Sequence, residues 1–186
     1  MNEASVATRR RYVTVLNRLG IIAVFSAFAF FSTLFIKVPL PVSGGYFNIG
    51  DTFVMLAAVL FGPLVGALVG LIGPTLSDLA GYAQFAPATA VIKTFEGLAV
   101  GLIGFRESGV SPGRCIVGLV LGAVIILVGY FAAEGFVYPY LAKFSPFFDA
   151  TNMGMAIGEL VPNTFQAVIS AVLAFGIWRL LRGSTS

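Results

Sequence analysis

The sequence predicts an all-α membrane protein in which six transmembrane helices form one bundle and both termini lie in the cytoplasm. Apolar residues make up 58% of its 186 residues, and charged residues only 10%. Soluble domains carry about 25% charged residues, and one core of this size cannot bury so much apolar surface. The arginines flank apolar segments and form no basic face, which argues against nucleic-acid binding. We therefore expect lipid, and not water, around most of the chain.

Prolines, glycines and charged residues divide the chain. We expect a cytoplasmic basic segment at residues 1–18, a six-helix membrane domain at residues 19–182 and a C-terminal tail at residues 183–186. The first helix ends before a loop rich in Pro, Gly and Ser, and residues 106–114 form a polar turn between the fourth and fifth spans. The six spans are predicted at residues 19–36, 51–61, 64–79, 88–105, 115–141 and 155–181.

The second span is the shortest of the six. Its length allows a rise of only about 17 Å, which is less than the hydrocarbon core of about 30 Å. Gly62-Pro63 therefore either ends this helix or kinks one long helix over residues 51–80. If residues 51–61 and 64–79 are two separate spans, all eight arginines lie on one side of the membrane, which the positive-inside rule assigns to the cytoplasm. We therefore predict six spans.

Ionisable side chains occur inside or at the edges of five of these spans. Such groups are costly at membrane depth, and they usually face the interior of a bundle or a cavity. With the predicted topology they all lie in the outer half of the membrane or near its midplane. The sequence therefore predicts a polar cavity that opens to the outside. The residues are Asp51, Asp78, Lys93, Glu96, Glu134 and Glu159.

Helical spacing places several polar residues on common faces. Glu159, Asn163 and Gln166 follow the i, i+4, i+7 pattern of one helical stripe. A second stripe contains Tyr130, Glu134 and Tyr138, and the rings of Tyr130, Tyr138 or Tyr46 are candidates for stacking on a heterocycle. We predict substrate binding by Glu134, Glu159, Asn163, Gln166, Lys93, Glu96, Tyr130, Tyr138, Asn48 and Asp78.

Two members of the polar set leave alternatives open. Lys93 and Glu96, at i and i+3, either form a structural ion pair or contact the ligand. Asp51 either caps its helix, where a carboxylate complements the helix dipole, or contacts the ligand. The chain has no histidine and one cysteine, so we predict neither a metal site nor a catalytic site.

Small residues recur at intervals of four. In Gly62, Gly66 and Gly70 this spacing is typical of helices that pack closely within a membrane bundle. Ala23 and Ala27 lie near the cytoplasmic end of the first span, away from the predicted cavity. We predict that a partner helix packs on these two alanines.

Two stretches of the sequence resemble the substrate-binding S components of energy-coupling factor (ECF) vitamin transporters. They are residues 45–67, with Asn48-Ile49-Gly50-Asp51 and Phe61-Gly62-Pro63 as the most specific parts, and residues 78–97. The resemblance extends over residues 17–182. Within that family the sequence is most similar to the group predicted to take up hydroxymethylpyrimidine, the thiamine precursor, or a related pyridine vitamin.

The resemblance implies a multi-pass protein of the bacterial inner membrane that binds a small water-soluble vitamin tightly in an outward-facing pocket. It implies that the loop at residues 39–50 closes over the ligand. It also implies that Ala23 and Ala27 dock onto a membrane coupling subunit, which works with two cytoplasmic ATPases. The chain has no GxxxxGK[ST] motif, so the partner ATPases would use the ATP, and we expect no cofactor in this chain.

Two other functions remain open from the residues alone. A stand-alone proton- or ion-coupled carrier would use Glu134 and Glu159 as its titrating pair, and inverted repeats would support it. A membrane enzyme without histidine would need an aspartyl dyad or a Ser-Lys pair. Asp51 and Asp78 lie near outer helix ends and not in paired midplane motifs, so we predict no enzyme activity.

Overall fold

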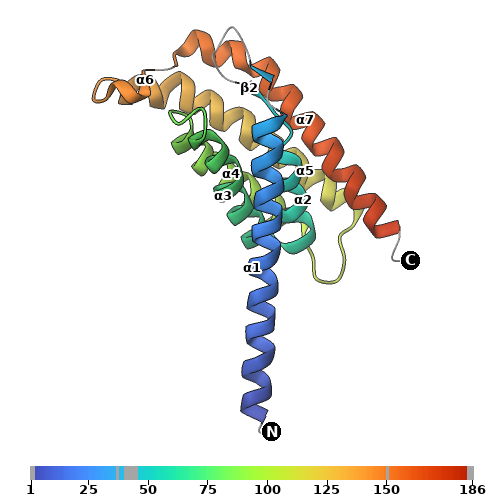
Figure 1. Cartoon of the computed structure of the whole chain (residues 1–186). Helices are drawn as coiled ribbons and strands as arrows, with labels where there is room; N and C mark the ends of the chain where they lie inside the picture. Colours follow the sequence, from blue (N-terminus) through green and yellow to red (C-terminus); the bar gives the residue numbers. More distant parts are fainter. Residues whose placement is uncertain (1–2, 37, 40–45, 150, 184–186) are drawn as a thin grey trace.

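The computed structural model describes residues 3–36, 38–39, 46–149 and 151–183, with side chains from Val15 onward (Figure 1). Its elements are helix α1 (Glu3–Phe35), strands β1 (Val38–Pro39) and β2 (Tyr46–Phe47), helices α2 (Asp51–Phe61), α3 (Pro63–Leu79), α4 (Ala86–Gly104) and α5 (Pro112–Ala132), a π-helical turn (Ala133–Val137), α6 (Tyr138–Leu141), a 3-10 turn (Pro146–Phe148) and α7 (Met153–Gly183). Because α6 continues α5 through the π-helical turn, the described residues form the predicted bundle of six membrane helices.

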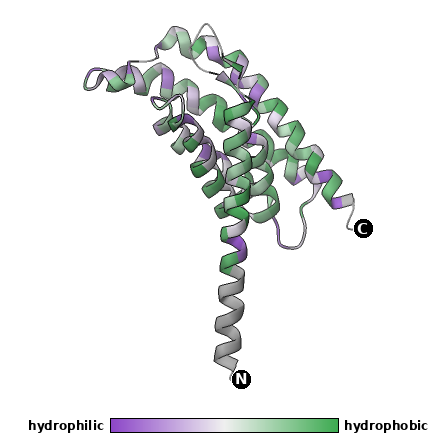
Figure 2. Cartoon of the chain, viewed as in Figure 1, coloured by the Kyte–Doolittle hydropathy of each residue, from purple (hydrophilic) through white to green (hydrophobic). Residues whose placement is uncertain are grey.

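Four of these helical segments are long and apolar enough to cross a membrane by themselves. They are Val15–Phe35, Ala86–Gly104, Pro112–Leu141 and Met153–Arg182, whereas α2 and α3 are shorter apolar helices. Hydrophobic residues line the helices along most of their lengths (Figure 2). Phe35 and Leu180, for example, expose 75% and 77% of their surfaces. Such exposure of large apolar side chains suits an acyl-chain environment, so the protein is a multi-pass membrane protein.

The first helix is longer than predicted. It begins at Glu3 and not near Leu19, so its backbone stays helical through most of the predicted basic segment. Figure 1 shows this part of α1 projecting beyond the other helices. The sequence between Glu3 and Phe35 contains no proline, the residue that interrupts a helix most strongly.

The Gly62-Pro63 dipeptide separates two helices. Gly62 has a φ of 96°, in the left-handed region that favours glycine, and Pro63 occupies the first turn of α3, where its missing N–H needs no partner. On the two sides of this break, a Cβ added to Gly66 would lie only 2.8 Å from the Cα of Ala58. The two helices therefore fold back on each other as a hairpin, and the single kinked helix is excluded.

Small residues also bring α3 and α4 together. A Cβ at Gly70 would lie 2.6 Å from the carbonyl carbon of Lys93, so the two helices touch backbone to backbone there. This contact confirms that the glycines spaced by four residues serve internal packing. It also fixes the depth at which Lys93 enters the bundle.

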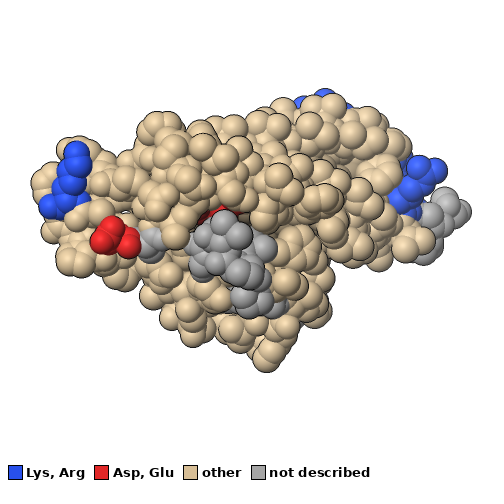
Figure 3. All heavy atoms as spheres, turned by 90° about the horizontal axis from the view of Figure 1, so that it is seen from above, with Lys and Arg blue, Asp and Glu red and all other residues tan. Residues whose placement is uncertain are grey.

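Both termini of the described chain lie toward the same end of the bundle. Figure 1 shows the start of α1, the end of α7 and the α4–α5 loop at this end, and the β1–β2 hairpin at the other. Arg182 near the end of α7 donates to the carbonyl oxygen of Val110 in the α4–α5 loop at 2.6 Å. Seen onto the hairpin end, the Lys and Arg side chains that are coloured lie toward the edges of the molecule, and acidic atoms are visible near the centre and toward one edge (Figure 3).

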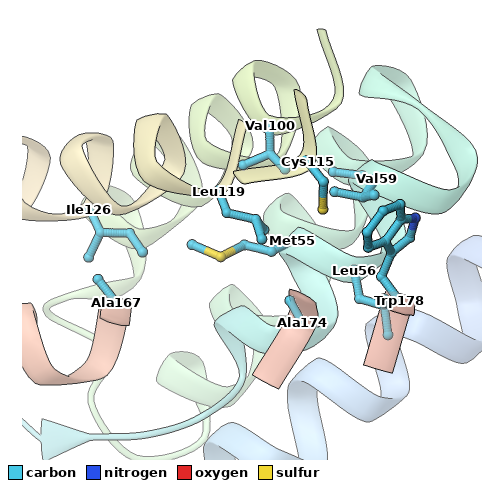
Figure 4. Packing of buried hydrophobic residues seen from close by; sticks show 11 residues of the cluster. Met55, Leu56, Val59, Val100, Cys115, Leu119, Ile126, Ala167, Ala174 and Trp178 are labelled. Atoms are coloured by element: carbon cyan, nitrogen blue, oxygen red, sulfur yellow. The ribbon is translucent and has the colours of Figure 1, made fainter. Parts of the chain in front are cut away.

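The apolar core lies between α2, α4, α5 and α7. Figure 4 shows Met55 and Leu56 of α2 among side chains of the other three helices. Cys115 is buried in this cluster as a small packing residue. The cluster contains Met55, Leu56, Ala58, Val59, Val100, Cys115, Leu119, Ile126, Ala167, Ala174 and Trp178. This core holds together the helices that carry polar side chains nearer the hairpin end.

Candidate functional site

The chain between α1 and α2 is fastened to the bundle through Asn48. Strand β2 pairs antiparallel with β1, with Pro39 opposite Tyr46, and Asn48 follows directly. The Asn48 side-chain oxygen accepts from the backbone N–H of Gly50 at 2.7 Å and from the Thr33 hydroxyl at 3.3 Å. These bonds hold the loop against the ends of α1 and α2.

Gln166 of α7 links this loop to the interior. Its side-chain oxygen accepts from both the backbone N–H and the side-chain amide of Asn48, at 3.0 and 3.1 Å. Its side-chain nitrogen donates to Asp51 at 2.9 Å. One side chain therefore connects the loop, α2 and α7: the Gln166 oxygen accepts two hydrogen bonds and one of its two N–H groups donates to Asp51.

Asp51, Lys93 and Glu96 form a buried group that we call the ion cluster. The Lys93 ammonium lies 2.6 Å from an Asp51 oxygen and 3.2 Å from a Glu96 oxygen, and the three side chains are at most 2% exposed. It also lies 5.3 Å from the centroid of the Tyr130 ring. Asp51 begins α2, but its carboxylate contacts Lys93 and Gln166, so this ion pair accounts for its position better than the predicted helix capping.

A polar pocket lies beside the ion cluster, beneath the loop. Its walls come from the loop, α3, α4, α5, the π-helical turn and α7. Its lining residues are Tyr46, Asn48, Asp78, Phe85, Thr89, Tyr130, Glu134, Glu159, Asn163 and Gln166. Its free volume is about 30 Å³, room for one or two water molecules, so a larger ligand must move some of the lining side chains.

Tyr46 and Asp78 join the loop to α3 at the edge of this pocket. The Tyr46 hydroxyl donates to the Asp78 carboxylate, and the Tyr46 ring lies 4.7 Å from the ring of Tyr82. Burial, and then the charge of Asp78, raises the pKa of the Tyr46 phenol well above its usual range. Tyr46 therefore stays protonated at neutral pH and remains a hydrogen-bond donor.

Glu134 lies on the π-helical turn. Such turns are rare and often occur at functional sites. The Thr151 hydroxyl donates to the backbone carbonyl of Glu134 at 3.0 Å. Among the described residues, one oxygen of the buried Glu134 carboxylate has no hydrogen-bond partner. Glu134 and Glu159 lie close enough to interact electrostatically.

The structure brings together most, but not all, of the predicted binding residues. Lys93 and Glu96 belong to the ion cluster and do not line the pocket, which favours their structural alternative. Tyr138 also lies outside the pocket, where its hydroxyl accepts from the backbone N–H of Ala88 at 3.3 Å and its ring packs 5.3 Å from that of Phe148.

Two residues that line the pocket, Phe85 and Thr89, were not predicted from the sequence. The Thr89 hydroxyl is hydrogen-bonded to that of Tyr130 at 3.0 Å. Thr89 precedes Lys93 by four residues, so helical spacing alone could have placed it on the polar face of α4. Phe85 directly precedes α4 and carries no polar signal.

Ala23 and Ala27 are exposed on α1, at the other side of the molecule. They line an apolar groove of about 470 Å³ with Ile72 and Leu76 of α3. Small residues such as these two alanines let another helix approach closely. In the described part of the chain, no three His, Cys, Asp or Glu side chains are grouped so that they could hold a metal ion.

Comparisons with known proteins agree with this architecture. Residues 14–182 match the family model described as "ECF-type riboflavin transporter, S component". A protein of Pyrococcus woesei, known as an uncharacterized protein in the gap 3' region, is 35% identical over 81% of this chain and 92% of its own length. A UPF0397 protein of Exiguobacterium sp. is 31% identical over 52% of this chain and 55% of its own. The solved S component of a bacterial ECF transporter has the same fold, with a TM-score of 0.65 and 21% identity over 91% of this chain and 98% of that one.

Proposed function

The chain belongs to the family of ECF-type riboflavin transporter S components, and from this premise we propose that it binds a small water-soluble vitamin or precursor for an ATP-driven importer. It is the substrate-binding subunit of a transporter and not an enzyme, as predicted. A subunit of this kind depends on partners for energy, which argues against the stand-alone carrier. The proposed ligand is a heterocycle related to hydroxymethylpyrimidine and thiamine, or one similar to pyridoxine.

The polar pocket beneath the loop is the main observation that supports this proposal. Polar side chains buried inside a membrane bundle are costly unless they are paired or serve a ligand. Asn163 can donate and accept hydrogen bonds, the Gln166 amide can donate, and Tyr46, Phe85 and Tyr130 supply aromatic rings in the same walls. Ring donors, ring acceptors and a flat π-face are the features that a vitamin heterocycle presents.

Native mass spectrometry of the purified full-length protein tests this function. We expect a bound small molecule of vitamin size to survive purification, because S components of the proposed kind bind tightly. Titration calorimetry with aminohydroxymethylpyrimidine, thiamine, pyridoxine and riboflavin then identifies the ligand class. If no ligand copurifies and none of these compounds binds, the proposed function is wrong.

We propose that the groove at Ala23 and Ala27 receives a helix of the membrane coupling subunit, which acts with two cytoplasmic ATPases. Replacing both alanines with leucine is expected to abolish uptake and to leave ligand binding by the isolated protein unchanged. Val24→Leu is the matched control, because Val24 is exposed on α1 but lies outside the groove. Normal uptake by the double variant in cells with the complete importer would exclude this face as the docking surface for the coupling subunit.

We also propose that both termini lie in the cytoplasm and that the loop lies outside, in the bacterial inner membrane. The buried Cys115 is first replaced with alanine, and single cysteines are then introduced at exposed Arg106 and Phe147. An impermeant reagent is expected to label position 147 in intact cells and position 106 only after lysis. Labelling of position 106 in intact cells would overturn the orientation.

A further inference from the structure

We infer that Tyr130 of α5 is the ring on which the ligand heterocycle stacks, and that Thr89 of α4 is the positioning residue that fixes this ring. This inference rests on the proposed function, because it assigns the stacking contact and its support within the same pocket. Tyr130 is one of three aromatic residues in the pocket lining, with Tyr46 and Phe85.

Tyr130 is held at its hydroxyl, at its ring and by packing. Its hydroxyl shares a hydrogen bond of 3.0 Å with the hydroxyl of Thr89. The Lys93 ammonium lies 5.3 Å from the centroid of its ring, within the range of a cation–π contact. The ring also packs against two apolar clusters, one around Met55 and one around Ile92. Together these contacts restrict the ring to one orientation.

Thr89 uses its hydroxyl differently from two other threonines inside helices. A helical threonine often bonds back to the carbonyl oxygen four residues earlier. Thr94 of α4 and Thr164 of α7 do so, at 2.6 Å. Thr89 is 2% exposed, and its hydroxyl bonds across the helix interface to Tyr130. Because a buried hydroxyl is costly without a partner, this bond fixes the position of both side chains.

The other two rings of the pocket come from the ends of elements. Tyr46 belongs to the two-residue strand β2, and a single hairpin of such short strands contributes little stability by itself. Phe85 precedes α4, and its side chain has no polar atom; its ring lies 6.4 Å from that of Tyr138, centroid to centroid. Tyr130 instead lies in α5, which continues without a break into the π-helical turn. We therefore expect Tyr130 to be the least mobile ring of the three.

The pocket must widen to admit a heterocycle. Its free volume is about 30 Å³, whereas sites for drug-sized ligands have volumes of about 300–1,000 Å³. The less restrained lining side chains move when the pocket widens, and Tyr130 remains as a fixed wall. A flat aromatic ligand gains most from a ring that is already in place, because binding then orders no further side chain.

Variants of Tyr130 test the stacking contact in the purified full-length protein. The probes are thiamine, aminohydroxymethylpyrimidine, pyridoxine and riboflavin, and affinity is measured by calorimetry. For the probe that binds most tightly, Tyr130→Leu is expected to lose about 5- to 150-fold in affinity, the effect of losing one aromatic stacking partner. The change that stacking causes in the near-ultraviolet absorption of the ligand should also disappear. Tyr140→Leu is the control, because Tyr140 is exposed and lies outside the pocket lining.

A double-mutant cycle tests the positioning role of Thr89. Thr89→Val and Tyr130→Phe each remove one hydroxyl of the pair, and each is expected to lose about 3- to 10-fold in affinity. Because the two hydroxyls form one contact, the double variant should lose no more than either single variant. Thr89→Ser keeps the hydroxyl and should restore both the affinity and the absorption change. Thr94→Val is the matched control, since Thr94 lies on the same helix and its hydroxyl bonds within that helix.

Three outcomes would contradict these assignments. Normal affinity of Tyr130→Leu would overturn the stacking role and leave the S-component function intact; should this variant not fold, normal affinity of Tyr130→Phe would do the same. Additive losses in the double variant would show that Thr89 contacts the ligand directly, and would overturn its positioning role. Binding of none of the four compounds, with no copurified ligand, would overturn the proposed function and this inference with it.

Discussion

The ion cluster and the pocket carboxylates are adjacent groups of buried acidic side chains that contact different neighbours. In the ion cluster, Asp51 and Glu96 share Lys93, and Gln166 closes the group by donating to Asp51. In the pocket, Asp78, Glu134 and Glu159 lie among polar and aromatic lining residues, and the Asp78 carboxylate accepts from the Tyr46 hydroxyl. The same residue type thus contacts a lysine in one group and lines a pocket in the other.

Because both groups are buried, we expect substitutions in them to have large effects. A charge inside a membrane bundle is costly unless a partner lies within hydrogen-bond distance, and removal of one partner is more damaging than removal of the pair. Substitutions in the ion cluster should therefore change the stability of the unliganded protein. Substitutions in the pocket should change ligand affinity. Gln166 belongs to both groups and should change both properties.

The largest effect is expected from Lys93→Met, which leaves two buried carboxyl groups without their cation. We expect a loss of about 3–5 kcal/mol in stability, seen as a large drop of the thermal unfolding midpoint in detergent. Lys143→Met is the control, because Lys143 is exposed and lies over the Tyr140 ring. A stable Lys93→Met protein that has lost only ligand affinity would show that Lys93 belongs to the binding site and not to a structural ion cluster.

An intermediate effect on both properties is expected from Gln166→Leu. The change leaves the Asn48 donors and an Asp51 oxygen without their partner, and such unsatisfied groups cost about 1–3 kcal/mol. We expect a moderate fall in the unfolding midpoint and faster ligand dissociation, measured by stopped-flow fluorescence, because the loop loses its anchor. Gln84→Leu in the α3–α4 loop, outside the pocket lining, should change neither. A normal dissociation rate for Gln166→Leu would show that Asn48 does not hold the loop over the ligand.

The smallest effect is expected from Glu96→Gln. Two carboxyl groups face one ammonium group, so the loss of one negative charge leaves the shorter Lys93–Asp51 pair intact. We expect a change in stability of less than about 1 kcal/mol and no change in ligand affinity, measured by thermal unfolding and calorimetry. Asp51→Asn should be clearly more damaging. The reverse order of the two variants would show that Glu96 is the principal partner of Lys93.

Local patterns in the sequence were sufficient to predict the fold class and the membrane spans. Hydropathy identifies a membrane protein because lipid-facing side chains must be apolar along whole helices. The predicted second span coincides with α2, Asp51–Phe61, since Gly62 and Pro63 end one helix and begin the next through their own backbone preferences. The predicted stripe of Glu159, Asn163 and Gln166 lines the pocket, because helical period alone places these residues on one face of α7.

Only the tertiary structure decided which polar residues meet. Spacing within α4 predicts the pair of Lys93 and Glu96, yet the shorter contact of Lys93 is with Asp51 of α2. The helical period tells on which face of its own helix a residue lies, but it does not tell which other helix packs against that face. Close approach of backbones decides this, as at Gly70, where α3 packs directly against the backbone of Lys93. That packing, together with the π-helical turn at Glu134, separates the acidic residues that contact Lys93 from those that line the pocket.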